Sequence, residues 1–75
     1  MPASNVIAQY QAGSPAANVK VVLSFRHGGM TSGDFTDSRG QAVVRHEGVG
    51  EADVLVSGNR KATFRAPGTI SVVVN

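Results

Sequence analysis

Two histidines and the acidic residues around them are the side chains of this sequence best suited to chemistry. His27 and His46 each follow an apolar run, Glu47 is adjacent to the second, and Asp34 and Asp37 lie between them. Imidazole and carboxylate groups together can hold Zn²⁺ or transfer protons. The two histidines are far apart in the sequence and there is no third, so such a site would depend wholly on the fold. We therefore predict no metal site and no cofactor, and interpret both histidines as surface or half-buried residues at strand ends.

Three of the serines could in principle act as a nucleophile beside one of the histidines. No glycine-framed turn of the nucleophile-elbow type surrounds Ser24, Ser32 or Ser38, and serines are ordinary residues of turns. Calcium would require several acids at short spacing, whereas Asp37 is better interpreted as the cap of a turn. We therefore predict that the chain is not an enzyme, with no catalytic residue and no small-molecule substrate.

The segment 26–34 is the best candidate for binding a partner. Its sequence, Arg-His-Gly-Gly-Met-Thr-Ser-Gly-Asp, combines glycines with charges of both signs. Loops often contain binding residues, and a methionine adapts to irregular apolar surfaces. We therefore predict that Arg26, His27, Met30 and Asp34 form a loop that contacts a partner. The alternative interpretation is a flexible hairpin connection.

Length and composition restrict the function classes further. Seventy-five residues form one domain, 1–75, with a single small core. Without cysteine, neither a disulfide nor a thiolate metal site can form. The formal net charge is +2, the basic residues are scattered, and the aromatic residues are three Phe, one Tyr and no Trp. Nucleic-acid binders gather basic residues on one face and add stacking aromatics, so we predict no nucleic-acid partner.

Targeting signals are missing from the sequence. No apolar run approaches ~20 residues, so we predict no membrane insertion, and residues 1–5 lack the basic and apolar regions of a signal peptide. Localisation therefore stays open. An extracellular or cell-surface location, as part of a longer chain, is favoured, and a cytoplasmic one follows if the chain is complete.

Alternation of apolar and polar residues runs through most of the sequence, and helical periodicity is missing. The predicted strands cover 6–11, 19–26, 30–36, 42–46, 52–56, 62–64 and 70–74. Turns separate them, the clearest being those defined by Gly13 with Pro15 and by Asp37 with Gly40. The sequence therefore predicts an all-β, seven-stranded antiparallel β-sandwich with no substantial helix. An exposed edge with Val22 or Val73 on its outer face is expected to recruit a partner.

Four turn-and-strand motifs resemble known families. They are Gly13-x-Pro15, Val19-x-Val21-x-Leu23, Thr36-Asp37-x-x-Gly40-x-Ala42-x-Val44 and Gly50-x-x-x-Val54-x-Val56-x-Gly58. This pattern resembles the bacterial Ig-like repeats of the invasin and intimin type, and also the carboxypeptidase regulatory-like, or transthyretin-like, domain. Both resemblances imply a non-catalytic spacer, stalk or accessory module.

Two functions follow as expectations. The first is a structural or spacer module in a larger bacterial surface or secreted protein, whose partners are neighbouring domains. The alternative is a protein-binding module, or a small β-rich subunit of a phage or secretion assembly. That second function would use an edge strand or the 26–34 loop, and would include self-association.

Overall fold

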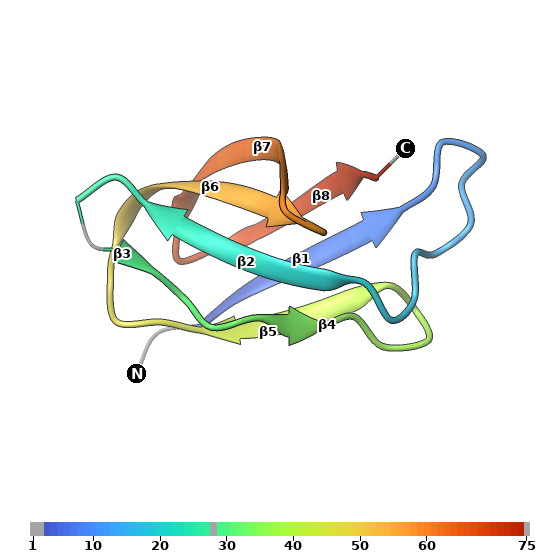
Figure 1. The fold of residues 1–75 in the computed structure, drawn as a ribbon, viewed down its shortest axis with the longest axis horizontal. Helices are drawn as coiled ribbons and strands as arrows, with labels where there is room; N and C mark the ends of the chain where they lie inside the picture. The colour runs from blue at the N-terminus through green and yellow to red at the C-terminus, as the bar shows by residue number, and fades with distance from the viewer. Residues whose placement is uncertain (1–2, 28, 75) are drawn as a thin grey trace.

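Eight β-strands and no helix make up the regular structure of the part described by the computed structural model, residues 3–27 and 29–74 (Figure 1). The strands are β1 (Ala3–Gln9), β2 (Lys20–Phe25), β3 (Gly29–Met30), β4 (Asp34–Phe35), β5 (Gln41–Arg45), β6 (Gly50–Val56), β7 (Asn59–Ala66) and β8 (Thr69–Val73). The all-β prediction is therefore confirmed.

The strands form two sheets that face each other. One sheet has three strands in the order β5-β1-β8. The other has five strands. Four of them follow the order β3-β2-β6-β7, and the fifth, β4, pairs with the start of β2, whereas β3 pairs with its end. Alternation explains this arrangement, because successive side chains of a strand point to opposite faces and one apolar face from each sheet must be buried.

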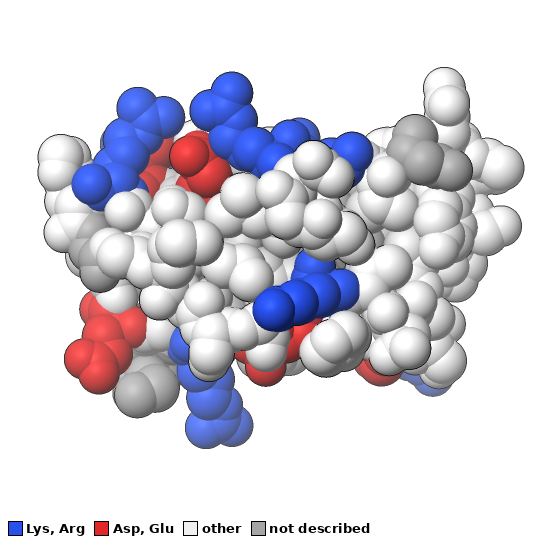
Figure 2. Space-filling view, viewed as in Figure 1, with Lys and Arg blue, Asp and Glu red and all other residues white. Residues whose placement is uncertain are grey.

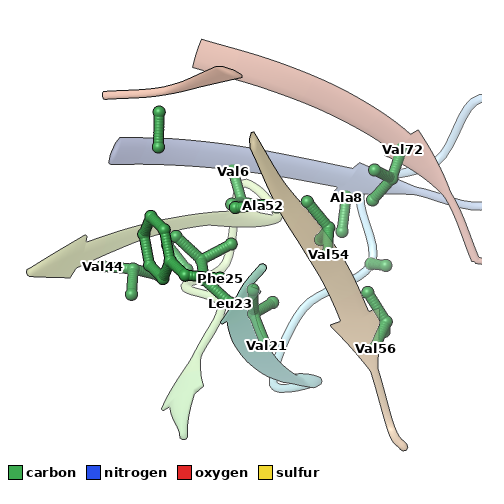
Figure 3. Packing of buried hydrophobic residues seen from close by; sticks show 13 residues of the cluster. Val6, Ala8, Val21, Leu23, Phe25, Val44, Ala52, Val54, Val56 and Val72 are labelled. Carbon is green, nitrogen blue, oxygen red and sulfur yellow. The ribbon is translucent and has the colours of Figure 1, made fainter. Parts of the chain in front are cut away.

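Small apolar side chains from the facing strands fill the space between the sheets. In β2, Val21, Leu23 and Phe25 are buried and the residues between them are half-buried. Figure 3 shows Ala8 and Val72 of the three-stranded sheet pointing into the same space as Val54 of the five-stranded sheet. Buried residues of both sheets thus form one core. The buried residues are Val6, Ala8, Ala16, Val21, Leu23, Phe25, Ala42, Val44, Ala52, Val54, Val56, Ala66 and Val72.

The predicted strand 30–36 is wrong in detail, because two short strands, β3 and β4, take its place. Between β3 and β4, a side chain takes the place of a strand as hydrogen-bond acceptor for β2. The backbone N–H of Leu23 donates to Thr31 Oγ1 over 3.0 Å. Further along, a Cβ on Gly33 would collide with the side chain of Lys20. Residues 31–33, between β3 and β4, are not part of a strand.

The prediction of a wholly antiparallel sandwich is also wrong, because β1 and β8 pair in parallel. Asn5 lies opposite Thr69 and Gln9 opposite Val73. The reason is the number of chain reversals. The chain reverses its direction from each strand to the next, except between β3 and β4, which both run antiparallel to β2. With this one exception among eight strands, the last strand runs in the same direction as the first.

Two polar turns set the ends of the strands. Asp37 Oδ1 accepts the backbone N–H groups of Arg39 at 2.8 Å and Gln41 at 3.0 Å. The hydrogen bonds from Gln41 and Arg39 hold the pKa of Asp37 below its usual value of 3.8. Gly40 has φ +76°, and a Cβ there would collide with the Ala8 carbonyl oxygen. In the other turn, Gly13 has φ +99° and Pro15 bridges to β1.

Candidate functional site

A hollow of about 360 Å³ opens where the connection after β2 meets the connection after β5. This is the left-hand end of the molecule in Figure 1, where β1 begins. The lining residues come from two distant parts of the sequence and are Phe25, Gly29, Met30, Thr31, Ser32, Arg45, His46, Glu47 and Gly48.

The hollow has an aromatic floor and a polar rim. Phe25 and His46 are only 7% and 4% exposed, and their ring centroids lie 5.0 Å apart with the planes tilted by 45°. Met30 is 67% exposed, and Arg45 and Glu47 on the rim are also exposed. Such a surface suits a single apolar side chain flanked by polar groups.

A chain of hydrogen bonds runs through the buried side of this hollow. Ser4 Oγ lies 2.8 Å from His46 Nε2, and His46 Nδ1 lies 2.7 Å from the Gly48 carbonyl oxygen. A carbonyl only accepts, so the hydrogen is assigned to Nδ1, and Nε2 accepts the Ser4 hydroxyl. Gly68 donates its backbone N–H to Ser4 Oγ over 3.3 Å.

This serine–histidine pair has the groups of a nucleophile and its base but not their setting. Ser4 is 1% exposed and lies among core residues, so a substrate would reach its hydroxyl only if the sandwich opened. The third group is a backbone carbonyl, not a carboxylate. The chain of bonds instead connects β1, the end of β5 and the turn between β7 and β8. We interpret it as a structural polar link.

The sequence predicted only part of this region. Ser4 was not a candidate, because 42 residues separate it from His46 and nothing in its local sequence marks it. The available signal was the alternation of β5, which places His46 inward after Val44. The interpretation of His46 as a surface or half-buried residue is therefore wrong, because only 4% of it is exposed.

The four residues expected to form a binding loop lie in different places. Met30 lines the hollow. Arg26 instead forms an ion pair of 3.0 Å with Glu51 and lies 4.0 Å from Asp53. The two remaining residues are not among those lining the hollow: His27 is exposed, and Asp34 is half-buried in β4.

No group of three or more His, Cys, Asp or Glu residues within 3–27 and 29–74 is arranged to hold a metal ion. Likewise, none of the described residues belongs to a helix of the length and hydrophobicity needed to cross a membrane.

A scan against protein-family models, a search of curated proteins and a search of solved structures each find no match to this chain.

Proposed function

We propose that this domain is a non-catalytic structural module of the Ig-like kind, which spaces the neighbouring parts of a longer surface or secreted protein. The observation that carries the proposal is the parallel pair of β1 and β8. Because they run side by side in one direction, the chain enters at one end of the domain and leaves at the other (Figure 1).

The shape of the domain supports the same function. Its principal extents are 33 × 20 × 18 Å, and β1 and β8 run broadly along the longest of these in Figure 1. A domain with both ends on one side would fold back on its neighbour. Here each domain added in series lengthens the chain of domains.

The polar link of Ser4 and His46 also supports a structural function. Its polar atoms bond to each other and to backbone groups inside the protein. A buried polar network that is fully paired makes one packing arrangement more favourable than its alternatives. A spacer depends on that property, because its length must stay fixed.

Small-angle X-ray scattering of tandem proteins tests the proposal. One, two and three copies joined by short linkers should increase in largest dimension by close to the 33 Å long axis for each copy. The same series with Ser71→Lys in every copy controls for contacts between domains, since Ser71 is exposed on an edge strand. Tandem proteins that stay compact in both series would contradict the spacer function.

A further inference from the structure

The sheet edges of this sandwich are protected very unequally. Edge strands expose unpaired backbone groups, and proteins guard them with charges, bulges, covering segments or short length. β3 and β4 are two residues each. β7 has a register shift opposite Val54 and Leu55 and carries three basic residues, Arg60, Lys61 and Arg65.

The two edges of the three-stranded sheet also differ from each other. β5 contains Arg45, and β4 lies against it. The connection between β4 and β5 adds a hydrogen bond of 2.9 Å from the Asp37 backbone N–H to the Gln41 carbonyl oxygen. β7 contacts β8, but β8 itself contains no charged residue and no proline.

One side of the β8 backbone is not paired with any strand of the described residues. Gly68 accepts the Asn5 N–H at 2.9 Å, and Val74 donates its N–H to Gln9 at 2.9 Å. Even-numbered positions therefore face β1, and alternation turns the backbone groups of Thr69, Ser71 and Val73 to the opposite side. Within 3–27 and 29–74, no strand pairs with β8 on that side.

Charge is distributed so that this edge stays neutral. The seven basic and five acidic residues all lie between Lys20 and Arg65, so β1 and β8 contain none of them. In Figure 2, basic side chains gather along the upper margin, where β7 lies in Figure 1. Apart from its lower edge, the right-hand end of the molecule, towards which β8 runs, shows almost no charge.

We propose that β8 is a self-association edge, which pairs antiparallel with β8 of a second copy of this chain. A two-fold axis at Ser71 places each Ser71 opposite its equivalent and Thr69 opposite Val73 of the second copy. The three outward-facing residues then each exchange backbone hydrogen bonds. The two three-stranded sheets become one continuous sheet.

The side chains of β8 fit this register. Val73 is 47% exposed on the outer face, where it would pack beside Thr69 of the second copy. On the inner face, half-buried Ile70 would lie opposite buried Val72 of the second copy. Valine, isoleucine and threonine favour strands, and their cross-strand contacts stabilise sheets.

A second copy is the occupant that the charges favour. Neutral β8 strands can pair with each other without repulsion, whereas two β7 strands would bring their basic residues together. The isologous arrangement also closes after two copies, so the edge is consumed and does not extend into a fibre. A longer surface protein with this domain would associate sideways at the same point.

Sedimentation equilibrium of the unmodified chain over a range of concentrations tests the inference. The expected result is a reversible dimer of twice the 7.7 kDa chain mass. Ser71→Lys puts two positive charges face to face, and should raise the dimer dissociation constant at least about tenfold. Val43→Lys adds the same charge at a residue 61% exposed on β5 of the same sheet, and should leave the dimer intact.

Charge exchange gives a second, independent readout. Ser71→Asp alone should also be monomeric, and mixing it with Ser71→Lys should restore a dimer of one copy of each. This rescue excludes misfolding as the cause, because the two single variants must fold to associate. A chain that stays monomeric at the highest concentration, or a dimer unaffected by Ser71→Lys, would overturn the inference.

Discussion

Ser4 is the residue whose importance is least visible in the sequence. Its hydroxyl donates to His46 Nε2 and accepts the N–H of Gly68, so one side chain satisfies groups from two other parts of the chain. A buried polar atom that loses its partner costs free energy, while a paired one contributes little. The contribution of Ser4 to stability is therefore seen most clearly when its hydroxyl is removed.

Ser4→Ala is expected to lower the free energy of unfolding by about 1–3 kcal/mol, because Nε2 of His46 is left buried without a donor. Chemical denaturation measures this change. Ser38→Ala is the matched control, since Ser38 is exposed in a turn, and its effect should be within about 0.5 kcal/mol of zero. Equal effects of the two substitutions would contradict the structural link.

At the scale of elements, the turn between β4 and β5 links stability to pH. The backbone N–H groups of Gln41 and Arg39 lower the pKa of Asp37 below 3.8. A carboxyl group with a lowered folded-state pKa stabilises the fold above its unfolded pKa, and this contribution is lost as the pH falls through the folded value.

Asp37→Asn keeps an oxygen that can accept the same hydrogen bonds but removes the charge. The unmodified protein should therefore be the more stable one at neutral pH. The difference should shrink below the unfolded pKa of 3.8, when Asp37 becomes protonated. Urea denaturation from neutral pH to about pH 2 measures both stabilities. A difference that does not change with pH would show that the charge of Asp37 makes no contribution.

Alternation in the sequence predicted the elements well because burial on one face of a strand is a local property. Val21, Leu23 and Phe25 occupy one face at period two, and all three are buried. The partner of a strand is not a local property. The pairing of β8 with β1 depends on the path of the whole chain, and so do the contact of Ser4 with His46 and the hollow that Met30 and Arg45 both line.

The glycines alone do not predict where a strand is interrupted. Gly33 lies between β3 and β4, where the predicted strand 30–36 is interrupted, and the side chain of Lys20 occupies the space beside it. That contact joins residues from different elements, so the sequence showed a glycine in a strand but not the lysine beside it. The size of the hollow likewise depends on how two connections meet, which no local pattern specifies.

At the scale of the whole molecule, the direction of β8 and its position in the sheet underlie the two proposals. β8 pairs in parallel with β1. This pairing places the ends of the chain at opposite ends of the domain, which supports a spacer. The edge position of β8 in the order β5-β1-β8 leaves one side of this uncharged strand open, which supports self-association. If β8 were antiparallel to β1, the ends of the domain and the register of the open edge would both change.

Cysteine cross-linking tests this pairing most directly, because the natural chain contains no cysteine. Gln9 and Val73 lie opposite each other in the parallel register, while Ala3 begins β1 at the far end of the pair. Under dilute oxidising conditions, the variant Gln9→Cys with Val73→Cys should form an internal disulfide, detected by intact mass. The variant Ala3→Cys with Val73→Cys should remain reduced. Closure of the second pair but not the first would contradict the parallel arrangement, and with it the spacer function.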